Sequence, residues 1–131
     1  MLLVEVHKPL EIFDDIHSTG ELGSEIVEQS LVIKTPKGLI VITDCAHPGV
    51  VQIVAKAKEL LNDEVYLVLG GFHLGGASES AIGNIVRSFR QLGVKKVAPC
   101  HCTGRLAMDI FEQEYGEDFI SNGAGKVITI E

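Results

Sequence analysis

Three histidines occupy equivalent positions along the chain, each after an apolar strand-like run and before a helix-like run. They are His47, His73 and His101, and each lies in a glycine-flanked turn. Imidazole binds zinc, iron or manganese through a neutral ring nitrogen, Asp44 offers a hard carboxylate oxygen, and Cys45 or Cys102 offers a soft thiolate. These residue types could therefore hold a metal ion together.

A purely structural role is the alternative for each histidine taken alone, because imidazole also caps helices and hydrogen-bonds backbone carbonyls. The equivalent placement of three histidines favours a shared site over three separate structural roles. A simple zinc-binding protein that uses Cys45, His47, His101 and Cys102 is a further possibility. However, the single residue between Cys100 and Cys102 is not the usual zinc spacing, and strand-end cysteines are often buried apolar groups.

Two other groups of residues receive structural interpretations. The pairs Gly70-Gly71 and Gly75-Gly76 match no phosphate-binding loop pattern, so we expect them to make tight turns. His7 and His17 lie in the strand-rich beginning of the chain, where we expect surface or packing roles.

The beginning of the chain reads as β structure. Four runs are expected to be strands: Leu2–Val6, Glu11–Ile16, Leu31–Thr35 and Leu39–Thr43. The join from Thr35 to Gly38 has Pro and Gly at turn positions and predicts a hairpin between the last two runs. The polar, acidic stretch from Gly20 to Ser30 is expected to be a surface loop.

After Thr43 the pattern changes to alternating helices and strands. Apolar residues at helical spacing predict a helix behind Pro48 up to Leu61, a second over Ile82–Leu92, and a third over Leu106–Phe111 with Thr103 as its N-cap. The strands expected in this part are Val65–Leu69, Val94–Ala98, Phe119–Ser121 and Lys126–Ile130. Ligands in α/β folds gather at the carboxyl ends of strands, so the three histidines are expected to share one pocket.

Composition sets outer limits on function. With 131 residues, the chain fits a single domain, residues 1–131. The net charge of −7 offers no electrostatic footprint for nucleic acid. No apolar run approaches the length of a membrane span, and three cysteines are too few for a disulfide framework, so we expect a cytosolic protein with free thiols. The mean hydropathy of +0.26 is high for a small domain, which suggests a surface for a partner.

The three histidine turns resemble the metallo-β-lactamase superfamily, above all its branch related to archaeal dihydropterin-methyl-ribofuranosylaminobenzene-phosphate synthases. The matching segments, which lie between about Glu11 and the C-terminus, are Asp44-Cys45-Ala46-His47, Gly70-Gly71-Phe72-His73-Leu74 and His101-Cys102-Thr103-Gly104. The resemblance implies half of an αββα sandwich, with a mixed sheet, about three helices and a metal site at the edge between two sheets. Asp44 departs from the glycine that the branch usually has.

The same resemblance implies roles for individual residues. His47 and His101 would be metal ligands, His73 would be catalytic, and the cofactor would be a divalent metal, with zinc expected. The residues that would bind substrate are Phe72, Cys102, Thr103 and Gly104. The superfamily's His-x-His-x-Asp-His motif has no counterpart, because no two histidines here are separated by one residue.

Two classes of function follow. The first is a metal-dependent hydrolase of esters or phosphoesters that represents the C-terminal half of the fold and works in a homo-oligomer, or with a separately encoded N-terminal half that adds ligands. The alternative is a non-catalytic metal-binding or assembly module. In either case we expect the sheet face not covered by helices to be the partner surface.

Overall fold

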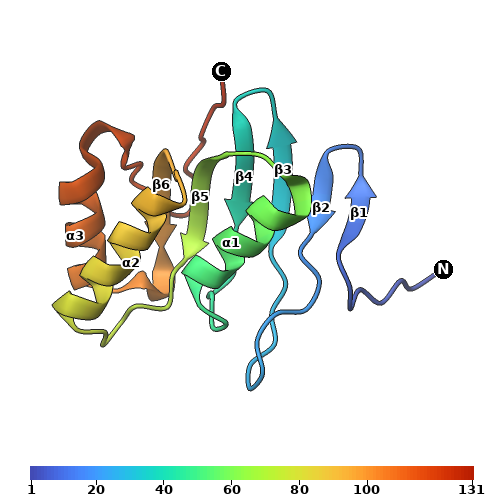
Figure 1. The fold of residues 1–131 in the computed structure, drawn as a ribbon, viewed down its shortest axis with the longest axis horizontal. Helices are drawn as coiled ribbons and strands as arrows, with labels where there is room; N and C mark the ends of the chain where they lie inside the picture. The colour runs from blue at the N-terminus through green and yellow to red at the C-terminus, as the bar shows by residue number, and fades with distance from the viewer.

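A computed structural model describes residues 1–131 and shows a six-stranded mixed sheet with three α-helices (Figure 1). The strands lie side by side in chain order from β1 to β6. The predicted α/β fold, with a mixed sheet and about three helices, is therefore confirmed. None of the helices combines the length and the apolar character that crossing a bilayer demands.

The first four strands form an antiparallel meander. They are β1 (Leu10–Phe13), β2 (Ile16–Ser18), β3 (Leu31–Thr35) and β4 (Gly38–Ile42). The predicted hairpin at Thr35–Gly38 joins β3 to β4 and is confirmed. Most of the predicted loop Gly20–Ser30 lies outside any strand, with one isolated bridge between Leu22 and Glu28.

Two strand predictions in this region were wrong. Glu11–Ile16 is not one strand, because the chain reverses at Asp14 and Asp15, and Asp15 adopts the left-handed φ of 63° that Asp tolerates better than most residues. Leu2–Val6 forms no strand, because no neighbouring strand takes its backbone hydrogen bonds. Its apolar side chains from Leu2 to Val4 are exposed instead.

The second part of the chain alternates helices with parallel strands. Its elements are α1 (Val50–Leu61), β5 (Val65–Gly71), α2 (Glu79–Gln91), β6 (Lys96–Cys100) and α3 (Arg105–Tyr115), with short 3₁₀ turns at His101–Thr103 and Gly116–Asp118. β4, β5 and β6 are mutually parallel, so their carboxyl ends meet at one edge of the sheet. The three predicted helices are confirmed, and β6 begins two residues later than the predicted Val94.

The C-terminal segment contains no strand, contrary to prediction. Phe119 makes only an isolated bridge to Val97, and residues 121–131 form no ladder. The apolar residues of this segment serve another purpose: Ile120, Ile128 and Ile130 pack against one face of the sheet. The apolar residues of this segment therefore cover a face of the sheet and do not form an additional strand.

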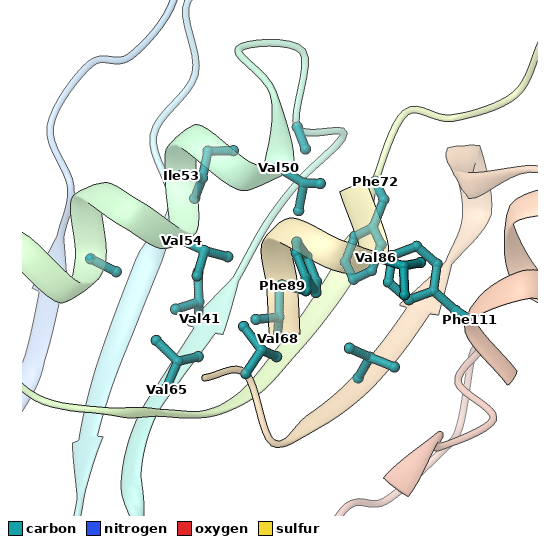
Figure 2. Packing of buried hydrophobic residues seen from close by; sticks show 14 of the residues in the cluster. Val41, Val50, Ile53, Val54, Val65, Val68, Phe72, Val86, Phe89 and Phe111 are labelled. Atoms are coloured by element: carbon teal, nitrogen blue, oxygen red, sulfur yellow. The ribbon is translucent and has the colours of Figure 1, made fainter. Parts of the chain in front are cut away.

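The main core lies between the sheet and the helices (Figure 2). Phe72, Phe89 and Phe111 pack edge to face with ring centroids 5.3 to 5.7 Å apart, and they join α2 and α3 to the end of β5. Each buried aromatic side chain contributes roughly 1.5–3 kcal/mol by removal from water. Because His73 follows Phe72 directly, this aromatic cluster anchors the start of the loop that carries His73.

The opposite face of the sheet carries a smaller apolar cluster. Ile40, Tyr66, Leu67 and Ala98 are buried there, with half-buried Ile33, Ile42 and Leu69 around them. Strand side chains alternate between faces, which explains why Leu39 and Val41 belong to the helix-covered core while Ile40 and Ile42 do not. The C-terminal segment covers part of this second face.

Candidate metal and catalytic site

Three loops meet at the carboxyl edge of the parallel strands. They follow β4, β5 and β6 and contain His47, His73 and His101, respectively. Hydrogen bonds join them: the Thr43 hydroxyl donates to the Gly71 carbonyl over 2.8 Å, and the Gly71 N–H donates to the Asp44 carbonyl over 2.9 Å. The edge that the sequence predicted is therefore where the three loops lie.

A group of three side chains that could bind a metal forms between the first and third loops. Cys45 Sγ lies 3.4 Å from His101 Nε2, and the ligand atoms of Cys45, His101 and Cys102 all lie within 4.8 Å of one another. Cys45 and Cys102 are half-buried, whereas His101 is exposed. Two sulfur atoms and one imidazole nitrogen are thus gathered at one point on the surface.

The loops hold unusual backbone conformations. Ala46, His73 and His101 have φ values of 60°, 51° and 27°. Such positive values cost residues with a Cβ atom roughly 1–2 kcal/mol each, and this kind of strain clusters at active sites and ligand clamps. All three strained residues lie in or beside the turns that carry the candidate ligands.

His47 and His73 form a pair, with ring centroids 4.3 Å apart and ring planes tilted by 48°. Glu28 holds the first of these rings, because its carboxylate contacts His47 Nδ1. The same carboxylate accepts the Ala46 N–H over 2.9 Å and the His47 N–H over 3.3 Å. With Nδ1–H donating to Glu28, the neutral His47 ring keeps the lone pair of Nε2 free for a metal or a proton.

His47 and His73 line an open cleft of about 550 Å³. Its other walls include Ser24, Glu25 and Gln52. His101 is not part of this cleft, and instead lies with Cys45 and Cys102. The structure therefore places the three predicted histidines in two neighbouring groups.

The surroundings raise the pKa of two thiols in this region, those of Cys45 and Cys100. Loss of contact with water raises the pKa of Cys45 to about 11, with further contributions from Cys102, Asp44 and Glu28. Burial also raises the pKa of Cys100, with the Cys102 charge adding to the effect. Negative charge at Cys45 therefore needs a nearby cation, and a bound metal would supply it.

The donor set fits a divalent metal of the zinc type. Bond lengths of about 2.0–2.3 Å place the ligand atoms of tetrahedral zinc roughly 3.3–3.8 Å apart. The Cys45–His101 separation of 3.4 Å lies in that range, and the 4.8 Å limit on the whole group leaves only small side-chain movements. His47 lies on the same loop as Cys45 but outside this group of three side chains.

The remaining residues expected to bind substrate are placed differently. Phe72 is 1% exposed in the aromatic core, and Thr103 is 0% exposed, with its hydroxyl donating to the Cys100 carbonyl and accepting the Phe72 N–H. Both side chains are therefore buried and have structural contacts in this chain, and their predicted substrate-binding role stays a prediction. Thr103 is not the N-cap of α3, because that position belongs to Gly104.

Gly104 also has a packing function. A Cβ atom there would lie 2.8 Å from the Gly75 Cα, and its φ is 84°. Glycine thus permits close approach of the second and third loops. Cys102 alone of the four predicted substrate residues lies in the metal-binding group.

Glu28 is the site residue that the sequence did not reveal. It lies in the stretch interpreted as a surface loop, and nothing in its spacing distinguishes it from neighbouring Glu25. Its side chain is nevertheless only 10% exposed. By contrast, His7 lies at the surface as expected, where hydrogen bonds that its ring donates to Glu21 and to Glu5 raise its pKa.

Comparison with known proteins supports the resemblance seen in the motifs. The chain is 43% identical over 102 residues to 7,8-dihydropterin-6-methyl-4-(beta-D-ribofuranosyl)-aminobenzene-5'-phosphate synthase of Methanocaldococcus jannaschii, covering 77% of this chain and 35% of that protein. It is 33% identical over 126 residues to an uncharacterized protein of the same organism, covering 96% of this chain and 46% of the relative. No protein-family model matches.

A solved structure gives the same result for the fold. The crystal structure of a metal-dependent hydrolase of the beta-lactamase superfamily superposes with a TM-score of 0.83 at 32% identity, covering 99% of this chain and 58% of the other. The chain spans between about a third and a half of the length of the two curated relatives. In both sequence and fold, the chain therefore resembles part of the metallo-β-lactamase superfamily of hydrolases.

Proposed function

We propose that this chain contributes one wall of a metal-dependent hydrolase site for esters or phosphoesters. The observation that carries the proposal is the pairing of His47 and His73 on one cleft, beside the ligand group at His101. The similarity to a metal-dependent hydrolase of the beta-lactamase superfamily supports the same reaction class. One curated relative is named for a phosphorylated product, which supports a phosphorylated ligand for this site.

The histidines have separate roles in this proposal. His47 and His101 are metal ligands, and Glu28 holds His47 through Nδ1, which leaves Nε2 as its ligand atom. His73, exposed on the cleft, positions the substrate or protonates the leaving group. A bound divalent metal supplies Lewis acidity and lowers the pKa of its water. Each role depends on a side chain that one of the three loops carries.

The proposed hydrolase site also requires ligands from outside these 131 residues, because the His-x-His-x-Asp-His pattern is absent from them. We propose that a second copy of the chain, or another chain, supplies them across the sheet face that carries Ile40 and Leu67. This face is apolar and only partly covered by the C-terminal segment, which suits association.

A non-catalytic metal-binding module is the second candidate. The group formed by Cys45, His101 and Cys102 favours it, because these ligands come from one chain and need no partner. Metal binding without turnover would be the signature of this function.

Hydrolysis of 4-nitrophenyl phosphate and its diester by zinc- or manganese-loaded protein tests the proposal, with His73→Asn compared to His17→Asn. Asn tolerates the left-handed backbone at position 73. We expect His73→Asn to lower the rate by about a hundredfold, in line with loss of a general acid, while its metal content stays unchanged. Wild-type protein that binds metal but hydrolyses neither substrate in the presence of its partner would support the non-catalytic alternative.

A further inference from the structure

We infer that Cys45, His101 and Cys102 form a thiolate-rich site that holds one zinc-type divalent cation within a single copy of this chain. The inference rests on the metal dependence of the proposed function, but not on turnover. It differs from the histidine ligand set of that proposal, because two cysteines and not His47 accompany His101. It also removes the need for a partner in metal binding.

Geometry is the first argument. The three side chains come from two loops, and Cys45 and Cys102 are 57 residues apart in the sequence. Their ligand atoms nevertheless lie within 4.8 Å of one another, and Nε2 of His101 faces the Cys45 sulfur at 3.4 Å. Cys102 Sγ has the Cys45 carbonyl as its partner at 3.5 Å, which is a weak contact that a metal bond would outweigh.

The orientation of the imidazole is the second argument. The ring of His101 is packed over Gly71, and its other nitrogen, Nδ1, contacts the Cys100 sulfur at 3.5 Å. The packing against Gly71 orients the ring so that Nε2 faces Cys45 before any metal binds. A ligand group arranged in advance loses little side-chain freedom on binding.

His47 has a competing set of contacts, which is the third argument. Its Nδ1 contacts Glu28, and its ring packs against His73 at 4.3 Å between centroids. Position and contacts therefore assign His47 to the cleft with His73. The cysteines are left as the partners of His101.

Thiolate and imidazole ligands select zinc and similar metals over magnesium or calcium, which prefer oxygen. Binding is balanced by the release of two protons, because each thiol becomes a thiolate when its sulfur bonds to the cation. With three protein ligands, a bound zinc-type cation would have room for a water molecule as a further ligand. The exposure of His101 gives solvent access to that position.

Cobalt(II) titration of the reduced chain, read by absorption, tests the inference. Cobalt replaces zinc in such sites, and thiolate ligands add intense sulfur-to-cobalt charge-transfer bands in the near ultraviolet. We expect one cobalt per chain, displaced by one equivalent of zinc. Cys45→Ser and Cys102→Ser should each weaken the charge-transfer bands. Each should also lower the affinity for cobalt by about tenfold or more, because a ligand bonded directly to the metal is lost.

Cys100→Ser is the matched control, because Cys100 borders His101 but lies outside the ligand group. It should retain the wild-type spectrum and stoichiometry. Circular dichroism of each variant checks its fold. Wild-type protein without charge-transfer bands would overturn the inference, as would unchanged bands in folded Cys45→Ser and Cys102→Ser.

Hydrolysis measured on the same samples separates this inference from the proposed function. Full charge-transfer bands without hydrolysis would support the cysteine site and count against the proposed hydrolase function. Hydrolysis by wild-type protein whose cobalt spectrum lacks sulfur bands would retain the hydrolase and exclude the cysteine site.

Discussion

The imidazole of His101 lies directly against Gly71, at a position where a Cβ atom would come within 2.5 Å of ring atoms Cε1 and Nε2. The same Cβ would also lie 2.6 Å from the Asp44 carbonyl oxygen. Glycine at the end of β5 thus leaves the room that the ring occupies. Gly71, the last residue of β5, thus sets the orientation of the His101 ring in the loop after β6.

Gly71→Ala should therefore displace His101 and weaken zinc binding by about tenfold or more. Changes to residues that support metal ligands lower metal affinity by at least this much. Isothermal titration with zinc measures this effect. Gly75→Ala is the control, because its Cβ would meet only the Cys102 carbonyl at an ordinary 3.7 Å. Equal zinc affinity in both variants would show that Gly71 does not position His101.

Glu28→Gln should lower hydrolysis by roughly 10- to 100-fold, because the amide carries no negative charge to hold His47 Nδ1. Glu25→Gln, on the wall of the same cleft, should leave the rate near wild type. Steady-state kinetics and melting temperatures of both variants make the comparison. A rate loss explained wholly by unfolding would contradict the positioning role.

Tyr115 should make stability fall at alkaline pH. Burial raises its pKa from 10.0 to about 12, and its hydroxyl donates to the Val94 carbonyl over 3.1 Å. The folded chain holds this proton more tightly than the unfolded chain, so the stabilisation is complete below pH 10 and is lost as pH rises through about 12.

The free energy of unfolding, measured with urea, should therefore fall by on the order of 2 kcal/mol between these pH values in the wild type. Tyr115→Phe should lack this decline. Tyr66→Phe serves as the second comparison, because the chain has only two tyrosines. Parallel pH profiles for wild type and Tyr115→Phe would refute the assignment.

Association through the sheet face should give a mass of at least twice 14.1 kDa in light scattering at micromolar concentration. A stable interface of this kind buries about 2,000 Å² in total. Leu31→Lys should favour the single chain, because Leu31 is 40% exposed and shares the face of Ile33.

Leu106→Lys is the matched control on α3, where the leucine is 48% exposed. It should leave the mass unchanged. A mass of 14.1 kDa for wild type, with no added partner, would exclude self-association as the source of further ligands.

Sequence patterns were sufficient for the three helices, for the strands β3 to β6 and for the edge where the histidines lie, but not for the strands at either end of the chain. Helical spacing located α1, α2 and α3, because one face of each helix must be apolar to pack on the sheet. The strand-to-helix position of His47, His73 and His101 placed their loops together, since parallel strands end at the same edge. The first inference depends on the local spacing of apolar residues, and the second depends on the parallel direction of the strands.

Only the tertiary structure decided which side chains meet at that edge. Glu28 reaches His47 across 19 residues, and Cys45 reaches His101 across 56, through loop paths that no repeating pattern encodes. Phe72 and Thr103 belong to the matching motifs, but both side chains point inward. Phe72 packs in the aromatic core, and the Thr103 hydroxyl forms two hydrogen bonds with backbone groups. Periodicity records which face of an element is apolar, whereas the partners of a loop side chain depend on how distant backbone groups satisfy their hydrogen bonds.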